Sequence, residues 1–256
     1  MTVARTEDNP IRVGVLGARG RMGAEVCRAV EAAEDMEIVA MVDTGDWMFD
    51  LADAGAEVVV DFTHPDVVLD NIRFCVDHDI RCVVGTSGFD LAKLDTVRQW
   101  LEPKPELGVL VAPNFALGAV LAMRFAQMAA RYYASAEIVE LHHDRKADAP
   151  SGTATHTARL ITAARAEAGV DPKPDATTSE VEGARGARLG DVRVHSVRLP
   201  GLVAHQEVLF GGDGETLSIR HDSFDRKGFM PGVLLGVRSI LNRPGLVVGL
   251  ESLLDV

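Results

Sequence analysis

The chain has 256 residues, of which 47% are hydrophobic, so it can bury one large core or two modest ones and is not disordered as a whole. Its formal net charge of −12 at pH 7 excludes a nucleic-acid or anionic-membrane surface, because polyanions require a basic footprint. No apolar run is long enough for a signal peptide or a membrane span, and we expect a cytoplasmic protein.

The first half of the chain alternates short apolar runs with segments of helical spacing. Strands are predicted at residues 11–16, 37–43, 58–62, 82–85 and 109–112, and helices at 22–33, 67–77 and 91–101. Alternation of this kind predicts an α/β fold with a doubly wound parallel sheet of Rossmann type. The three cysteines, Cys27, Cys75 and Cys82, lie among apolar residues without metal-ligand spacing, so we expect buried reduced thiols and no metal site.

Beyond Asn114 the pattern changes and predicts a second, α+β domain. Helices are expected at residues 119–133 and 153–168, and strands at 137–142, 192–199, 203–210 and 215–221. A polar stretch over residues 169–190 predicts a loop, and residues 211–214 (Gly-Gly-Asp-Gly) predict a hairpin turn. The strands indicate a mixed or antiparallel sheet. A last helix at 233–241 and strand at 246–250 are predicted, but pattern alone assigns them to neither domain.

A glycine-rich turn joins the first strand to the first helix. Its glycines follow a Gly-x-x-Gly-x-x-Gly pattern, and its residues are Gly17, Ala18, Arg19, Gly20, Arg21, Met22 and Gly23. At this place glycines let a pyrophosphate approach backbone amides at a helix start. A turn of this composition can also serve tight strand-to-helix geometry alone, so the motif needs support from its context.

Asp43 supplies that context, because it ends the second strand twenty residues after Gly23. An acidic side chain there accepts hydrogen bonds from the adenosine ribose hydroxyls, although an aspartate can also simply open a turn before Gly45. Its charge disfavours the 2′-phosphate of NADPH, whereas Arg19 and Arg21 attract it. Both NADH and NADPH are therefore expected as cofactors, with NADH favoured.

Two further strand ends carry polar residues and turn formers. They are Gly85-Thr86-Ser87 and Ala112-Pro113-Asn114-Phe115. Each segment taken alone can be an ordinary turn. Ligands of doubly wound sheets lie over the carboxyl ends of the strands, so together with the glycine turn these segments are predicted to ring one crevice.

The stretch from Glu140 to Ala154 is predicted to carry the reaction chemistry. His142, His143 and Lys146 follow a strand end, immediately before a helix that opens Ser151-Gly152-Thr153. Histidine and lysine exchange protons near neutral pH, and amides at a helix start hold a carboxylate. In the alternative interpretation Ser151 is an ordinary N-cap and the basic residues are solvated. A metal site is disfavoured because the two histidines lack a third ligand at fixed spacing.

These motifs together resemble the 4-hydroxy-tetrahydrodipicolinate (formerly dihydrodipicolinate) reductases of lysine and diaminopimelate biosynthesis. The resemblance runs from Ile11 nearly to the C-terminus. It includes the glycine turn, Asp61-Phe62-Thr63, residues 85–89 (Gly-Thr-Ser-Gly-Phe), residues 112–115 (Ala-Pro-Asn-Phe) and the block from Glu140 to Ala154.

The resemblance implies that hydride passes from NADH or NADPH to a cyclic dicarboxylic imine, giving tetrahydrodipicolinate after loss of water. By position, His142 matches the catalytic histidine, Lys146 the proton donor, His143 a substrate contact, and Gly152 with Thr153 the amides that hold a substrate carboxylate. The cofactor shell corresponds to residues 17–22, Asp43, residues 85–87 and residues 112–115.

The family also implies the domain organisation and the assembly. Residues 1–116 and 227–256 would form the dinucleotide-binding domain, and residues 117–226 the substrate-binding domain, whose sheets assemble a homotetramer. The chain departs from many relatives by having Asp43-Thr44 where they have an acidic residue followed by Arg, which leaves the cofactor preference open. It also has Asp144-Arg145 between His143 and Lys146, a difference expected to affect fine tuning only.

Two other functions fit parts of the pattern. Another two-domain reductase of amino-acid metabolism would keep the site from Gly17 to Asp43 without needing His142 and Lys146 together. A sensor that binds a nicotinamide cofactor without turnover would need no proton donor beside an anion-binding helix start.

Overall fold

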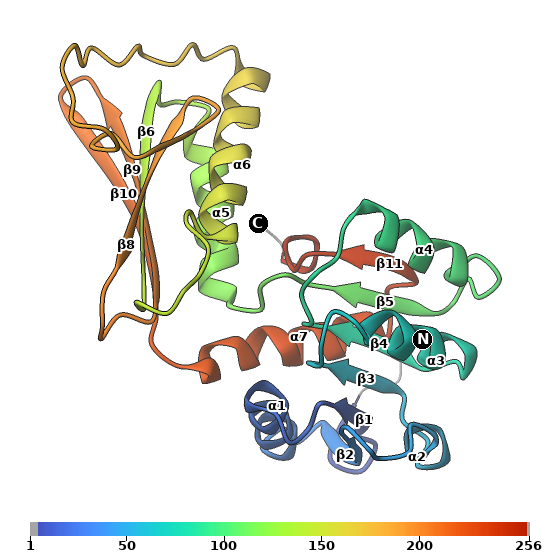
Figure 1. Cartoon of the computed structure of the whole chain (residues 1–256). Coiled ribbons are helices and arrows are strands. Elements are labelled where there is room, and N and C mark those ends of the chain that lie inside the picture. Colours follow the sequence, from blue (N-terminus) through green and yellow to red (C-terminus); the bar gives the residue numbers. More distant parts are fainter. Residues whose placement is uncertain (1–4, 255–256) are drawn as a thin grey trace. The chain divides into compact units, whose positions relative to one another are not determined.

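The computed structural model describes residues 5–254, and these form two compact units (Figure 1). Unit 1 contains the described residues up to Leu117 and from Arg226 onward, and unit 2 contains Gly118–Asp225. Residues 1–4 and 255–256, which fall in the predicted dinucleotide-binding domain, lie outside the described part. No helix between residues 5 and 254 is both long and apolar enough to cross a membrane.

Unit 1 is built on a six-stranded parallel sheet with the order β11-β5-β4-β3-β1-β2. Its strands are β1 (Ile11–Leu16), β2 (Met36–Val42), β3 (Val58–Asp61), β4 (Arg81–Val84), β5 (Gly108–Val111) and β11 (Gly245–Val248). The chain leaves β1 towards β2 on one side and returns to β3 on the other. The carboxyl ends of β1 and β3 therefore form the switch point where such sheets bind ligands.

Helices cover both faces of this sheet. They are α1 (Arg21–Glu31), α2 (Phe49–Asp53), α3 (Val68–Asp77), α4 (Leu91–Leu101) and α7 (Met230–Ile240), with short 3-10 turns η1 (Arg226–Phe229) and η2 (Glu251–Leu253). Gly236 of α7 packs on Val83 and Leu110, whereas the alternate side chains of the same strands pack on α3 and α4. Because both faces are covered, the central strands are almost continuously apolar.

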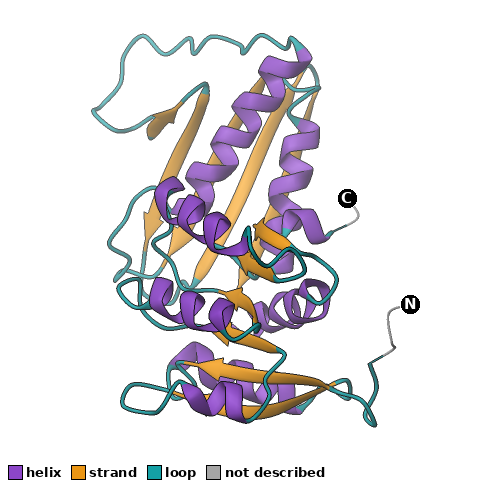
Figure 2. Cartoon of the chain, turned by 90° about the vertical axis from the view of Figure 1, so that its right-hand side faces the viewer, coloured by secondary structure: helices purple, strands orange, loops and turns teal. Residues whose placement is uncertain are grey.

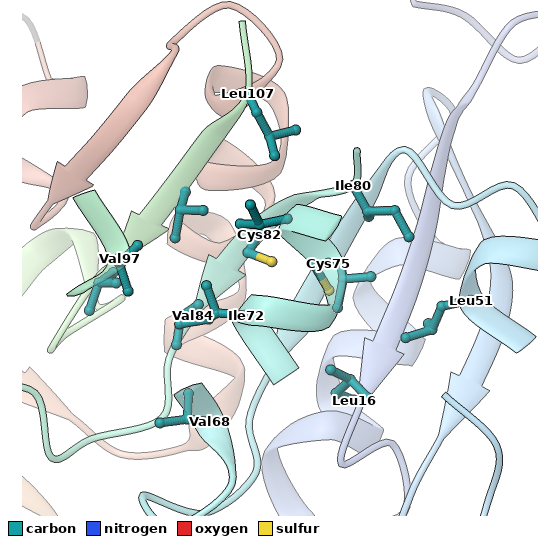
Figure 3. Packing of buried hydrophobic residues seen from close by; sticks show 14 of the residues in the cluster. Leu16, Leu51, Val68, Ile72, Cys75, Ile80, Cys82, Val84, Val97 and Leu107 are labelled. Carbon is teal, nitrogen blue, oxygen red and sulfur yellow. The ribbon is translucent and has the colours of Figure 1, made fainter. Parts of the chain in front are cut away.

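The main apolar cluster of unit 1 contains two of the cysteines (Figure 3). Cys75 of α3 and Cys82 of β4 are fully buried, and Cys27 is also buried. All three are free thiols, as predicted. A hydrogen bond with Cys75, together with burial, raises the pKa of Cys82 well above its usual range, so this thiol stays protonated.

Unit 2 has a five-stranded mixed sheet whose helices share one face (Figure 2). Its elements are α5 (Leu117–Ala129), of which only the first residue belongs to unit 1, and β6 (Ser135–His142), α6 (Gly152–Ala168), β7 (Ala187–Leu189), β8 (Val192–Arg198), β9 (Ala204–Gly212) and β10 (Glu215–Ser223). The order is β10-β9-β6-β8-β7, with β6 and β8 parallel and the other pairs antiparallel. Side chains of α5 and α6 form one apolar core with β6, β8 and β9.

The fold class is as predicted, and the differences are local. Residues 169–190 were expected to be a loop, but Ala187–Leu189 form β7, a three-residue edge strand paired with β8. The helix α2 was not predicted at all. Both elements are too short to show a period in the sequence. The hairpin turn shrinks to Asp213 and Gly214, because β9 continues through Gly212.

Candidate functional site

The glycine turn of unit 1 holds a set of backbone donors open. Gly17 has a φ of +75°, and a Cβ there would lie 2.5 Å from the Phe62 carbonyl oxygen, so the turn requires glycine. Helix α1 starts at Arg21, and its N-cap Gly20 offers no capping side chain. The first intrahelical bond runs from the Ala24 amide to the Gly20 carbonyl, so the amides of the first turn remain free for an anion.

A pocket of about 510 Å³ adjoins this turn at the switch point. It is formed by the ends of β1, β2 and β3 and the start of α3. Its lining is Leu16, Gly17, Gly20, Val42, Asp43, Thr44, Gly45, Asp46, Met48, Phe62, Thr63, His64, Val67 and Asn71. Apolar walls, open amides and a carboxylate at a strand end are the features that fit an adenosine diphosphate moiety.

Asp43 braces the glycine turn as well as facing the pocket. Its carboxylate accepts hydrogen bonds from the amides of Arg19 and Thr44, both at 2.8 Å. These bonds hold the pKa of Asp43 below its usual range, so the side chain stays ionised. Each carboxylate oxygen keeps a lone pair for a ribose hydroxyl. The same aspartate therefore shapes the turn and offers acceptors to a ligand.

The strand ends that were predicted to complete the cofactor shell lie beside this pocket, not in its lining. Residues 85–87 follow β4 and residues 112–115 follow β5, so both segments lie at the same sheet edge as the glycine turn. Gly85 is required by packing, because a Cβ there would lie 2.1 Å from the Phe62 ring. The Asn114 side chain accepts from the Ala116 amide, and Ser87 is exposed.

A buried carboxylate, Asp61, links these strand ends, and no sequence pattern predicts this role for it. Asp61 is 1% exposed, and it accepts hydrogen bonds from the hydroxyls of Thr63 (2.8 Å) and Thr86 (2.6 Å) and from the Asn71 amide group (2.8 Å). Because Thr86 follows β4 and Thr63 follows β3, Asp61 fixes two loops of the sheet edge at once.

In unit 2 a second buried carboxylate, Glu140, organises the predicted reaction centre. Glu140 is completely buried on β6, and its carboxylate accepts hydrogen bonds from several donors. Arg198 of β8 donates two of them in a fork, at 2.7 and 2.8 Å, the Ser151 amide donates one at 3.1 Å, and His142 Nδ1 lies at 2.5 Å. Burial would raise the pKa of Glu140, but these donors outweigh it and hold that pKa below its usual range.

The pairing with Glu140 sets the protonation state of His142. Burial lowers the pKa of His142 below its usual range, and the charges of Lys146 and Arg198 lower it further, against the opposing effect of Glu140. The ring is therefore neutral at pH 7. Its proton lies on Nδ1, facing the carboxylate, so Nε2 carries a lone pair. None of the hydrogen bonds among residues 5–254 uses Nε2.

The other predicted residues of this block follow His142 in the sequence, some in the loop after β6 and some in the first turn of α6. Lys146 forms an ion pair with Asp148 at 2.7 Å and is 21% exposed. His143 Nδ1 is buried and has no hydrogen-bond partner within the described part of the chain. A buried nitrogen without a hydrogen-bond partner raises the free energy of the folded protein, so such atoms are expected mainly where a ligand or a water molecule supplies the partner.

The start of α6 offers two unused amides. Ser151 is the N-cap, and its hydroxyl accepts a hydrogen bond from the Ala154 amide at 3.2 Å, as the alternative interpretation of this serine predicted. The Gly152 and Thr153 amides belong to the first turn and have no intrahelical acceptor. A Cβ added at Gly152 would meet nothing within 4 Å, and Gly152 has no positive φ. The fold does not require a glycine here, and the space before the helix is open.

The sequence predicts site roles for His142, His143, Lys146, Gly152 and Thr153, and it gives none to Glu140 or Arg198. A signal existed for Glu140, since residues two apart on a strand share a face and an acid beside a buried histidine is its usual partner. Arg198 comes from a strand 56 positions further along and meets His142 only through the β6–β8 register. No cluster of three or more metal-ligating side chains exists among residues 5–254.

Comparison with known proteins identifies the family. Residues 11–115 match the family model "Dihydrodipicolinate reductase, N-terminus" and residues 118–254 match "Dihydrodipicolinate reductase, C-terminus". A protein named 4-hydroxy-tetrahydrodipicolinate reductase from Nocardia farcinica is 65% identical, covering 96% of this chain and 99% of that protein. One of the same name from Mycolicibacterium gilvum is 60% identical, covering 96% and 100%.

Solved structures agree. The dipicolinate-bound dihydrodipicolinate reductase from Paenisporosarcina sp. TG-14 has a TM-score of 0.84 at 40% identity and covers 96% of this chain and 100% of its own. A diaminopimelate dehydrogenase from C. glutamicum, at 14% identity and a TM-score of 0.55, shares the fold alone. The glycine turn, the block from Glu140 to Ala154 and these full-length matches lead to one conclusion: the chain belongs to the dihydrodipicolinate reductase family.

Proposed function

We propose that this protein catalyses the NAD(P)H-dependent reduction of 4-hydroxy-tetrahydrodipicolinate to tetrahydrodipicolinate, a step of diaminopimelate and lysine biosynthesis. The observation that carries the proposal is the group built on Glu140, in which a neutral His142 lies beside Lys146 and the open start of α6. The names of the relatives and the dipicolinate bound to a family member support a small cyclic dicarboxylate as substrate.

The donors of unit 2 suit a dianion. The Gly152 and Thr153 amides and the dipole of the 17-residue helix α6 favour one carboxylate. His143, with its unsatisfied buried Nδ1, is proposed to contact the substrate as well. On a chain with net charge −12, such local donors must supply the attraction that the overall field does not.

Reduction adds one hydride and one proton to the ring after water has left. A dinucleotide held by the glycine turn and the pocket of unit 1 would supply the hydride from its nicotinamide end. We assign the proton to Lys146, because its side chain carries only hydrogen-bond donors and pairs with Asp148, whereas neutral His142 presents a lone pair at Nε2. His142 then accepts a hydrogen bond from the substrate, and Glu140 stabilises any positive charge that develops on the imidazole of His142.

Two finer points belong to the same proposal. The face of the unit 2 sheet that α5 and α6 leave open carries apolar side chains such as Val197 (36% exposed) and Leu209 (37% exposed), which supports assembly as a homotetramer through these sheets. We also place the reaction in the cytoplasm, where reduced nicotinamide is available. A tetramer mass by light scattering is expected, and a monomer at assay concentration would contradict the assembly.

The test is loss of NADH and NADPH absorbance when substrate is generated in situ from pyruvate and aspartate semialdehyde by the preceding synthase. Oxidation should require both enzymes. His142→Gln and Lys146→Ala should each lower kcat by about 10²- to 10⁴-fold with cofactor binding intact. Normal cofactor binding without oxidation would instead support a sensor, and near-wild-type turnover by both variants would indicate a different reductase.

A further inference from the structure

A second carboxylate, Asp46, lines the pocket of unit 1 beside Asp43. The two belong to one turn, in which the Asp46 amide donates to the Asp43 carbonyl at 3.0 Å. One oxygen of the Asp46 carboxylate receives both the Asp43 amide at 2.9 Å and the Arg19 guanidinium at 2.8 Å. The fold therefore fixes the position of Asp46 and uses it to hold Arg19.

Arg19 is the basic side chain tied to the acidic rim of this pocket. It leaves the glycine turn and reaches the turn after β2, where it pairs with Asp46 and approaches the Thr44 carbonyl at 3.5 Å. Its side chain is 63% exposed. A guanidinium in this position suits a phosphate, but here a carboxylate already occupies it.

We propose that Asp46 sets the preference between NADH and NADPH, by placing a second negative charge at the pocket and by keeping the Arg19 guanidinium engaged. The inference rests on the dinucleotide site proposed above. A cofactor with two ribose hydroxyls enters without disturbing the ion pair. A cofactor with a 2′-phosphate must take Arg19 from Asp46 and then lie close to two carboxylates, so its binding is selectively weakened.

The decisive variant is Asp46→Asn. The amide oxygen of asparagine still accepts from the Asp43 amide, so the turn is kept while the charge is lost and Arg19 is released. Two unit charges of a phosphate a few ångströms from a carboxylate in screened solvent correspond to an expected gain of about five- to twentyfold in NADPH affinity. NADH affinity should change by less than about twofold, because a neutral ribose makes little use of this charge.

The matched control is Asp50→Asn in the first turn of α2. Asp50 is exposed, lies four residues further along the chain and is not among the lining residues of the pocket, so it gives the same change in net charge without freeing Arg19. Kd values for NADH and NADPH by titration calorimetry need no turnover. A double variant, Asp46→Asn with Arg19→Gln, should lose most of the NADPH gain.

The outcomes separate this inference from the proposed function. If the unaltered protein binds neither cofactor, the dinucleotide site itself is wrong. If it binds them but Asp46→Asn shifts both Kd values equally, or Asp50→Asn gives the same NADPH gain, Asp46 is not the discriminating residue. If the NADPH gain survives removal of Arg19, the charge of Asp46 acts alone and the ion-pair part of the inference is overturned.

Discussion

Replacing Glu140 with glutamine should remove the charge around which the proposed reaction centre is built, with little change in side-chain shape. Both oxygens of the carboxylate are fully used, by His142, Arg198 and the Ser151 amide. Glutamine offers one acceptor and one donor group, so at least one of these partners then faces a donor. Loss of one partner of a buried ion pair costs about 3–5 kcal/mol. We expect the lower end for Glu140→Gln, since Arg198 is 19% exposed.

The same change should lower the pKa of His142 further. Glu140 provides the interactions that raise this pKa, and in their absence burial, Lys146 and Arg198 all act in the lowering direction. The wild-type acid limb of kcat/KM is expected below pH 6.5, and in Glu140→Gln it should move to lower pH. Without the carboxylate, the His142 proton is no longer held on Nδ1 and the imidazole is no longer held in place. Misplacement of a group in a reaction centre lowers kcat by about 10²-fold, and we expect a loss of this size.

Stability against pH gives an independent reading of Glu140. Its pKa in the folded protein lies below the ordinary value of 4.5, so its stabilising effect is present above pH 4.5 and is lost as pH falls towards the folded value. The free energy of unfolding of Glu140→Gln should fall less steeply with acid than that of the wild type.

The assay combines kcat/KM profiles, NMR titration of His142 and chemical unfolding. Glu167→Gln is the control, because Glu167 lies in an exposed ion pair with Arg131, where the same loss of charge should cost less than about 1 kcal/mol and leave kcat unchanged. A folded Glu140→Gln with wild-type kcat/KM and an unshifted His142 pKa would refute the role of Glu140.

Three further changes test the remaining parts of the two sites. Gly152→Ala adds a methyl group in the open space before α6, so the melting temperature should not change. Dipicolinate binding measured by calorimetry should weaken about tenfold, which corresponds to the loss of one hydrogen bond to a charged group. Unchanged binding would show that the start of α6 is not part of the substrate site. Asp61→Asn should lower stability by about 2 kcal/mol and weaken both cofactors, leaving dipicolinate affinity alone, because an amide that still accepts from Thr63 and Thr86 turns its own NH2 group towards the Asn71 amide donor. Asp43→Ala should weaken NADH more than NADPH in parallel titrations, since it removes ribose acceptors and a charge that repels the 2′-phosphate, and equal losses would show that bracing of the glycine turn dominates.

The elements that could be predicted from the sequence are those whose pattern is local. The buried strands of unit 1 appear as short apolar runs. The glycine turn is also visible in the sequence, because the positive φ at Gly17 and its close contact with the backbone require a glycine there. The pairing of β11 with β5 depends on contact between segments more than 130 residues apart, so no local pattern assigns the C-terminal strand to a sheet. The short elements α2 and β7 carry too few residues for any period.

The candidate sites follow the same division. Residues proposed to contact ligands directly, such as His142 and Lys146, stand close together in the sequence, so a local pattern predicts them. Residues that act through others are not predicted in this way, because their partners meet only in the fold. Asp61 depends on Thr86 beyond the next strand, and Arg198 depends on the parallel register of β6 and β8.

The two proposed sites share one requirement, the binding of multiply charged anions by an acidic chain, and both offer backbone amides for it. In unit 1 the free amides at the start of α1 face the glycine turn, and in unit 2 the free amides at the start of α6 face open space. Backbone donors of this kind act over a few ångströms and add no net charge, so they hold an anion without making the surface basic. The carboxylates nearby are then not a contradiction. Asp43 orients the glycine turn and Glu140 orients the His142 ring, and hydrogen-bond donors supplied by the fold keep both carboxylates ionised.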